Sequence, residues 1–366
     1  MRRPFSTILE TLLCMSPGNY FKALRLLTFL SLASAFCSPV ARAAESTNSC
    51  SRVFAFEYAL GGRLQIDPRA EDLAEPIETY AQIITRIDAD IAPLLAPTET
   101  KIKIDTAHIF SAFDDRDFSV SVGVRPPDFQ PFSKKANRNI LIHEYGHAIF
   151  EKNLVANSPE YREMRKYGLA LEKELLANDM LLKKLQKQND KSAEWSTAVA
   201  ENNRLKKLAE DFINLKRVRY AYHEVFADTL VWITTKNPKA IREGLENLAT
   251  PAQENSVASL QMRDMDAGLD PLNMQTWKEK MEFVVFVNSD LYFPFLPVRW
   301  ELWSLSKDKI HDEAYRKSLP DKVFRVLLKN FTEDLGQSPK AFDARGRIEG
   351  VIRLNDKIIH DLRQTI

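Results

Sequence analysis

The stretch His143-Glu144-Tyr145-Gly146-His147 constrains this chain more than any other, because it places two metal-binding side chains four residues apart. On an α-helix four residues advance by roughly 400°, so His143 and His147 lie about 40° apart on one face. Two imidazoles in this position can bind a single Zn²⁺, and Glu144 can reach a water bound to that ion. The stretch therefore predicts a helix over about 137–153 that carries half of a zinc site. The alternative is a plain helix with two core or surface histidines.

A second stretch supplies the acidic groups that such a site needs. Glu224 and Asp228 are four residues apart in a largely apolar segment, 220–232, that we expect to be helical. Two carboxylates facing a core would be costly unless they met a metal ion or a positive group. We therefore predict Glu224 as the third zinc ligand and Asp228 as the acceptor of the free ring N–H of a ligand histidine. His223 is the alternative third ligand, and Glu224 would then be structural.

Together, His143-Glu144-Tyr145-Gly146-His147 and Glu224-Val225-Phe226-Ala227-Asp228 resemble the gluzincins, which are zinc peptidases whose third ligand is a glutamate on a second helix. The resemblance covers these two helices. It implies a zinc metallopeptidase, most simply an endopeptidase, in which Glu144 takes a proton from the attacking water and passes it to the leaving amine. The alternative is a binding protein on the same scaffold that zinc stabilises and that has no catalytic activity.

The same resemblance implies a Tyr or His side chain that stabilises the developing oxyanion. Tyr292 is the preferred candidate, because it lies in an aromatic loop that follows both ligand helices. Tyr220, Tyr222 and His311 are the alternatives, and residues of these types are often simply part of a core or a surface. Arg299, in the same aromatic stretch as Tyr292, would bind a substrate carboxylate or brace the site.

Residues 1–43 have the features of a signal peptide. Basic residues precede an apolar stretch at 26–37, and Ala41-Arg42-Ala43 has the small-x-small pattern of a cleavage site. The apolar stretch is short for a membrane span, although a retained anchor is the alternative. Cleavage would leave Cys50 as the single cysteine, which excludes an intramolecular disulfide. We expect an exported protein, periplasmic or secreted from a bacterium, with no stable membrane span after cleavage.

The charge of the chain argues against a nucleic-acid partner. The whole chain has 51 basic and 50 acidic residues, and loss of residues 1–43 would remove five of the former and one of the latter. The mature chain would be slightly acidic, so bulk charge could not hold nucleic acid. A peptide or protein substrate is the expected partner, and Zn²⁺ is the expected cofactor.

The pattern of the whole chain predicts an α+β protein that is mostly helical. The strand expected at 118–124 would form a sheet edge that lines a cleft, where an extended peptide could pair with it; an ordinary sheet strand is the alternative. Further strands are expected at 52–60 and 101–105, helices at about 67–95, 239–248, 251–265 and 275–287, a buried loop leading into a helix at 288–303, and two or three amphipathic helices within 320–366.

A helical hairpin is expected between the two halves of the site, at about 158–219. The chain has no glycine between 168 and 244 and no proline between 159 and 238, and a polar turn at 188–192 separates a first helix from a second one at 195–215. The hairpin would act either as a lid or substrate-selecting arm, or as a spacer packed on the body. Residues 44–366 would form one zincin-like metallopeptidase domain, with this insertion and a helical C-terminal part at about 239–366.

Overall fold

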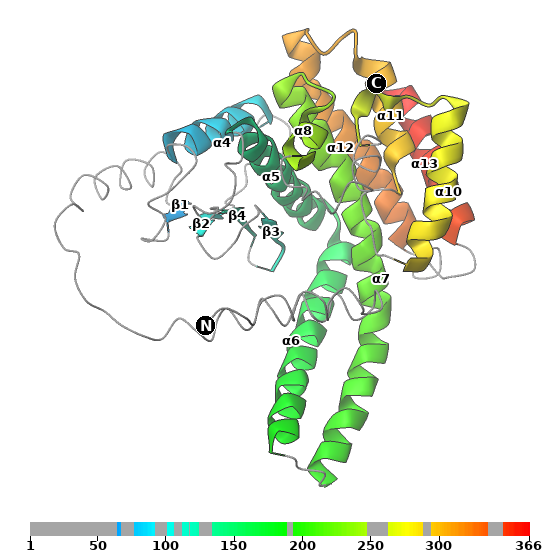
Figure 1. Ribbon diagram of the computed structural model, residues 1–366. Coiled ribbons are helices and arrows are strands. Elements are labelled where there is room, and N and C mark those ends of the chain that lie inside the picture. The colour runs from blue at the N-terminus through cyan, green and yellow to red at the C-terminus, as the bar shows by residue number, and fades with distance from the viewer. Residues whose placement is uncertain are drawn as a thin grey trace, which may run out of the picture.

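The computed structural model describes residues 64–66, 77–91, 101–105, 112–116, 118–123, 134–188, 193–246, 263–287, 294–335 and 347–366. Across these ranges the protein is mostly helical, with one small sheet, as the composition predicts (Figure 1). The expected signal peptide, the expected strand at 52–60 and Tyr292 lie outside the described residues. None of the described helices is long and apolar enough to cross a membrane.

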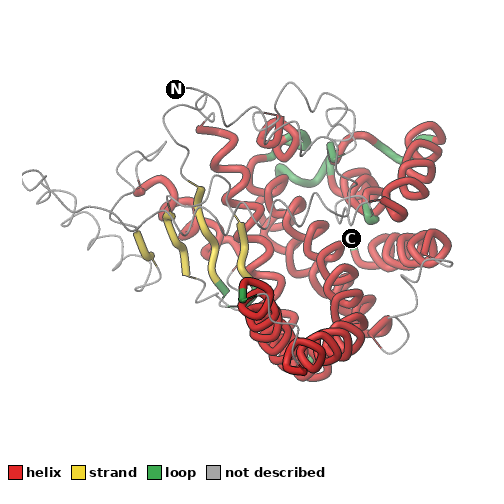
Figure 2. Tube along the Cα trace, turned by 60° about the horizontal axis from the view of Figure 1, so that its bottom comes forward, coloured by secondary structure: helices red, strands yellow, loops and turns green. Residues whose placement is uncertain are grey.

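The sheet has four short strands, which lie side by side at one side of the helical body (Figure 2). Their order is β1-β2-β4-β3; β1, β2 and β4 run parallel, and β3 pairs antiparallel with β4, with Phe113 opposite Val120. The strands are β1 Leu64–Ile66, β2 Lys101–Asp105, β3 Ala112–Asp114 and β4 Ser119–Gly123.

Two of the predicted strands are present, but the expected sheet edge is elsewhere. β2 and β4 match the predicted strands at 101–105 and 118–124. The prediction that 118–124 forms the edge is wrong, because β4 pairs with β2 on one side and with β3 on the other. Among the described strands the edges are β1 and β3, and β3, which pairs with β4, was not indicated by the sequence pattern. At three residues it is too short to show the alternation that identifies a strand.

The His-Glu-x-x-His stretch lies in the middle of α5, Lys134–Asn157, which extends beyond the predicted helix at both ends. Nearly every residue from Asn139 to Phe150 is buried, so this helix is covered on most of its faces, as its apolar flanks predict. One helix packed against it is α4, Ile77–Ile91, which falls within the predicted helix at 67–95 and buries Tyr80, Ile84 and Ile87.

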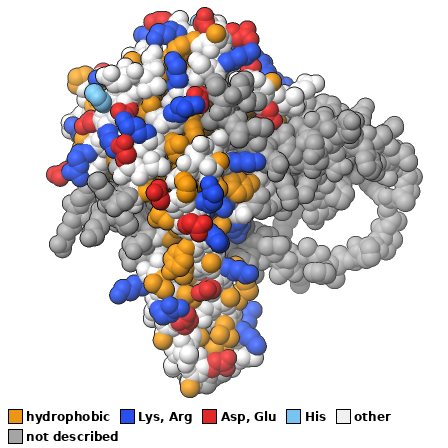
Figure 3. Space-filling view, turned by 180° about the vertical axis from the view of Figure 1, so that it is seen from behind, with side chains coloured by type: hydrophobic (Ala, Val, Ile, Leu, Met, Phe, Trp, Pro, Cys, Tyr) orange, Lys and Arg blue, Asp and Glu red, His pale blue; other side chains and the backbone are white. Residues whose placement is uncertain are grey.

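The second helix of the hairpin and the segment 220–232 that carries Glu224 form one continuous helix. α6, Pro159–Lys187, begins at Ser158, whose side chain accepts the Tyr161 N–H, and α7 runs unbroken over 43 residues from Ala193 to Thr235. The prediction of separate helices at 195–215 and 220–232 is therefore wrong. At 1.5 Å per residue α7 is about 65 Å long. Its first half pairs with α6 in an arm that projects from the body (Figures 1 and 3), and its second half enters the core beside α5.

The C-terminal part is helical, as predicted, with shifted boundaries. The described end of the predicted helix at 251–265 is a turn that leads into a short 3₁₀ helix, η2. The prediction of a buried loop leading into a helix at 288–303 is confirmed for its described part, where a buried helix begins at residue 296. The elements are α8 Ala240–Glu246, η2 Met265–Ala267, α10 Pro271–Val287, α11 Leu296–Ser306, α12 Glu313–Leu335 and α13 Arg347–Thr365.

Candidate metal centre

The site forms where α5 and the second half of α7 pack against each other in opposite directions. His143 of α5 meets Glu224 and Asp228 of α7, whereas Glu151, two turns further along α5, meets Arg219 and His223, which precede them on α7. The four-residue spacing along each helix places these groups on facing sides. Two helices therefore present a continuous row of polar side chains to each other inside an apolar core.

Three potential ligands converge on one point. The Nε2 atoms of His143 and His147 are 3.0 Å apart, and the Glu224 carboxylate lies 3.3 Å from each of them, through Oε2 and Oε1 respectively. All three side chains are buried. Ligand atoms at about 2.0 Å from a tetrahedral ion lie roughly 3.3 Å from one another, so these separations suit a small four-coordinate cation. The arrangement could hold a metal ion, and it brings the three predicted ligands together.

Asp228 occupies the position predicted for it behind the first histidine. Its Oδ1 lies 2.9 Å from His143 Nδ1, which directs His143 Nε2 toward the other ligands. Two arginines contact the same carboxylate: Arg263 Nη2 lies 3.0 Å from Oδ1, and Arg299 Nε lies 3.1 Å from Oδ2. Burial would raise the pKa of Asp228, but Arg263, Arg299 and His143 lower it to about 2. Asp228 is therefore charged and fixed in place.

Burial and carboxylates act in opposite directions on His143. Burial would lower its pKa, but Glu224 and Asp228 raise it to about 10. The pKa of Glu224 is held well below its usual range: burial would raise it, and the two histidines lower it. Without a metal ion, His143 is protonated and lies between the carboxylates of Glu224 and Asp228. A divalent cation could replace that proton.

Glu144 lies beside the ligand group and is bound by the sheet. Its Oε2 accepts the backbone N–H of Phe113, in the edge strand β3, at 2.8 Å. Ligand atoms of His143, Glu144 and His147 lie within 4.8 Å of one another, and the Glu144 side chain is partly exposed. Desolvation raises the pKa of Glu144, although the two neighbouring histidines lower it. The carboxylate is therefore positioned next to the potential ligands, with one oxygen held by the strand.

His223, the alternative third ligand, points away from the group. Its Nε2 lies 3.1 Å from Glu151 Oε2, and the residue is completely buried. Burial lowers the pKa of His223 to about 4, so the imidazole is neutral. Glu224 thus faces both ligand histidines, while the neighbouring His223 belongs to a second polar cluster.

The remaining candidates divide between the core, the surface and the site. Tyr222 is fully buried against Phe295 and Phe331, and His311 lies in an exposed turn, so neither is placed to contact a substrate. Tyr220 packs against Arg219, with 4.6 Å between the guanidinium and the ring centre. Arg299 is buried against Asp228 and therefore braces the site.

Arg263 is a site residue that the sequence did not reveal. Its Nη2 contacts both Asp228 and Glu224, the latter at 3.3 Å. It stands at the end of a segment expected to be an ordinary helix, and it is 39 residues from the nearest potential ligand, Glu224, so no periodic pattern marks it. The two buried carboxylates four residues apart were the available signal, since each requires a positive partner.

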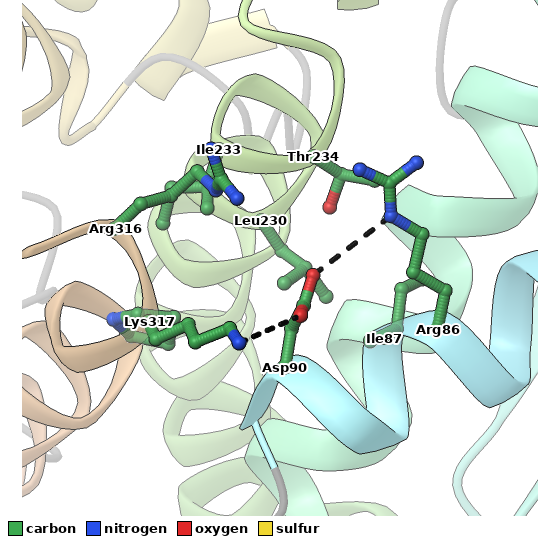
Figure 4. A pocket seen from close by; sticks show the side chains of 9 residues that line it. Arg86, Ile87, Asp90, Leu230, Ile233, Thr234, Arg316 and Lys317 are labelled. Atoms are coloured by element: carbon green, nitrogen blue, oxygen red, sulfur yellow. Dashed lines mark ion pairs between the residues drawn. The ribbon is translucent and has the colours of Figure 1, made fainter. Parts of the chain in front are cut away.

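A small surface cavity elsewhere has a different chemistry. It lies between α4, the end of α7 and α12, and Asp90 stands between Arg86 and Lys317 at 3.9 Å from each (Figure 4). None of its lining residues belongs to the ligand group. Because its acid and bases compensate each other at the surface, we assign no ligand to it.

Fold and site together define a mostly helical protein with a small mixed sheet and a group of buried His, Glu and Asp side chains that could hold a metal ion. The chain matches no known family, no curated protein and no solved structure.

Proposed function

We propose that this protein is an exported zinc-dependent peptidase of gluzincin-like architecture. The observation that carries the proposal is the position of Glu144, which adjoins the two histidines without being needed as a third ligand, since Glu224 faces both of them. A purely structural metal site has no use for an additional carboxylate held at its side. A peptidase needs one, to accept a proton from the attacking water.

His143, His147 and Glu224 would hold the ion, and the donor set favours zinc. Two neutral imidazoles and one carboxylate form a ligand combination that catalytic zinc sites use, and carbonyl-rich sites for Ca²⁺ or Mg²⁺ differ from it. A bound zinc ion would lower the pKa of a coordinated water and polarise a substrate carbonyl. Asp228 would keep His143 in the tautomer whose Nε2 faces the ion.

Glu144 would be the general base. One of its oxygens accepts the Phe113 N–H, which leaves the other to accept a proton from water and to deliver it to the leaving amine. The resemblance to the gluzincins also requires an oxyanion donor, and Tyr292 remains our proposal for that role.

The edge strand offers a place for an extended substrate. In β3, Phe113 turns its N–H toward Glu144 and away from β4, so the outer edge of the strand faces the ligand group. The Phe113 N–H is taken by Glu144, so a peptide would bond to this edge by donating a backbone N–H to the outward Phe113 carbonyl, which would place its backbone on the side where Glu144 lies. This transfers the expected peptide-binding edge from β4 to β3.

The direct test combines metal content with turnover. We expect purified protein to contain one zinc per chain and to cleave peptides from an unbiased library, and Glu144→Gln to retain the zinc and lose cleavage by at least about 10³-fold. Glu163→Gln, the same change at an exposed position on α6, is the control and should behave as wild type. Unchanged turnover in Glu144→Gln would refute the proposal, and stoichiometric zinc without any cleavage would favour the non-catalytic binding protein.

Export is a separate part of the proposal. It rests on the basic start, the apolar stretch at 26–37 and the Ala41-Arg42-Ala43 pattern. Protein recovered from an expressing bacterium should begin at Ala44 and be found in the periplasm or the medium. An intact N-terminus in the membrane fraction would instead identify a retained anchor.

A further inference from the structure

Two arginines from the base of the arm hold the turn that joins β3 to β4. Arg165 of α6 donates from Nη2 to the backbone carbonyl of Asp115, and its guanidinium lies 4.6 Å from the centre of the Phe118 ring. Arg219 of α7 donates from Nη2 to the Asp115 carboxylate at 2.7 Å. Both helices of the arm therefore contribute an arginine to the same turn. Figure 1 shows β3 close to the base of α6.

The same two arginines bind the motif helix. Arg165 Nε and Arg219 Nη1 both donate to Glu151 Oε1, at 2.8 and 3.2 Å, and the Tyr161 hydroxyl donates to it at 2.8 Å. Glu151 follows His147 by four residues on α5. Burial would raise the pKa of Glu151, but Arg219, His223 and Tyr161 lower it, so it carries a charge. The arginines therefore bridge the helix of the metal ligands to the β3–β4 turn.

This cluster is buried and its charges are compensated. Arg219 is 1% exposed, Glu151 0% and Asp115 6%, and Lys216 of α7 lies between Asp115 and Glu172 of α6. Removing one member of such a cluster leaves an unpaired charge in the core, so its geometry is fixed far more firmly than that of an exposed ion pair.

The turn held by this cluster begins where the edge strand ends. Phe113, which donates its N–H to Glu144 at 2.8 Å, precedes Asp115 by two residues in a strand of three. Phe118, at the other end of the turn, has a φ of +53°, which a phenylalanine seldom adopts unless its surroundings impose it. So short a strand has few contacts of its own, and the position of its N–H depends on the turn.

We propose that Arg165 and Arg219 are positioning residues, which hold the β3–β4 turn so that the Phe113 N–H keeps the Glu144 carboxylate beside His143 and His147. The role of Glu144 as a base rests on the proposed function, whereas the contacts of Arg165 and Arg219 with the β3–β4 turn do not. The base of the arm thereby has a task of its own, whatever the outer part of the arm does. The helical hairpin that separates the two halves of the site thus supplies the arginines that align β3 with α5 and α7.

Two substitutions with matched controls test the proposal. Asp115→Asn removes the charge that Arg219 holds, and Asp321→Asn is its control, since it makes the same change at a surface pair with Arg325 that lies away from the turn. Arg165→Gln removes the second hold. Arg162→Gln is its control, since the Arg162 side chain donates to the carbonyls of Val155 and Ala156 at the surface. Should Asp115→Asn not fold, Arg165→Gln carries the test, because the Arg165 side chain is 13% exposed and its replacement disturbs the core less than a change at Asp115, whose side chain is 8% exposed.

Amide hydrogen exchange of the segment 112–116 in zinc-loaded protein is the first measurement, and kcat and KM on a cleaved peptide are the second. We expect exchange at least about tenfold faster in Asp115→Asn and Arg165→Gln than in their controls, with kcat about tenfold lower, KM nearly unchanged and zinc content intact.

Exchange equal to that of the controls would show that the two arginines do not hold β3 in place. Faster exchange with unchanged kcat would overturn the positioning role. If wild type cleaves nothing, the proposed function fails, and the exchange rates still decide whether the arginines hold the strand.

Discussion

Gly146 of α5 lies directly against the backbone of Ala227 in α7: a methyl group on Gly146 would be 2.8 Å from Ala227 Cα and 3.2 Å from its Cβ. This contact lies between the two ligand histidines on one helix and between Glu224 and Asp228 on the other. The missing side chain is what lets the two helices approach closely enough for Glu224 to reach both imidazoles at 3.3 Å.

Gly146→Ala should therefore separate the helices at the site. We expect a loss of about 1–3 kcal/mol in the free energy of unfolding, since overpacking of a tight contact costs that much, and a weaker zinc affinity because the ligands move apart. Thermal unfolding and a zinc competition titration measure the two effects.

A second change shows whether the backbone contact is responsible. Adding Ala227→Gly removes the Cβ at 3.2 Å but leaves the Cα at 2.8 Å, so the double variant should remain destabilised and should still bind zinc weakly. Full rescue by Ala227→Gly would mean that the Cβ, and not the close approach of the helix backbones, limits the site.

The ligand geometry was predictable because it is local in each helix. His143 and His147 on one helix, and Glu224 and Asp228 on another, need only a four-residue spacing and a buried helix face, and both can be seen in the sequence. Gly146 is visible in the same motif, but its role in helix packing depends on which residue of α7 it contacts. The position of Arg263 depends entirely on the tertiary fold, so it could not be predicted from a pattern.

The errors at α7 and β3 have different causes. No glycine or proline separates 195–215 from 220–232, so the sequence contains no signal for a break. The change of composition from charged to aromatic residues suggests a boundary between two helices, but α7 continues through it. That change marks the point where the helix leaves the exposed arm and enters the core. β3, in contrast, exists because its neighbours position it, and three residues cannot encode that.

Glu224→Ala should lose stoichiometric zinc, because its carboxylate lies 3.3 Å from both histidine Nε2 atoms. His223→Ala is the informative comparison, since that side chain faces Glu151 and should leave zinc content unchanged. Metal analysis after dialysis distinguishes the two. Zinc retained by Glu224→Ala and lost by His223→Ala would reverse the ligand assignment.

Asp228→Asn should weaken zinc binding by about 10- to 100-fold, because the partner that orients His143 loses its charge. It should also destabilise the protein, since Arg263 and Arg299 would both lose the buried charge of Asp228, and Glu224 would remain beside Arg263. Asp321→Asn, at an exposed pair with Arg325, is the control for affinity and for thermal stability. Wild-type affinity in Asp228→Asn would show that the 2.9 Å contact with His143 does not orient the ligand.

Zinc binding should release a proton. In the metal-free protein the pKa of His143 is raised to about 10, so the imidazole is protonated at neutral pH, whereas a metal ligand must be neutral. Apparent zinc affinity should therefore rise about tenfold per pH unit from pH 7 to 9, measured against a chelator whose own protonation is known. Calorimetry in buffers of different ionisation enthalpy should show about one proton released per zinc. An ordinary His143 pKa near 6.5 would instead give an affinity that is nearly constant above pH 7.5.

Removing the outer arm should leave the metal centre intact and reveal what the arm does. The contacts that hold the outer parts of α6 and α7 run between the two helices themselves, as in Asn178 to Ala198 and Asp179 to Asn202, whereas the cluster around Arg219 lies at the base. Replacing residues 176–204 by a short glycine linker should therefore preserve zinc content and the cleavage of small peptides. It deletes Leu176 and Met180, which are exposed. Figure 3 shows hydrophobic side chains on the surface of the arm. A selective loss of kcat/KM on folded protein substrates would identify the arm as the part that selects them. Equal kcat/KM on peptides and proteins would identify it as a spacer, and loss of zinc would contradict the separation of arm and site.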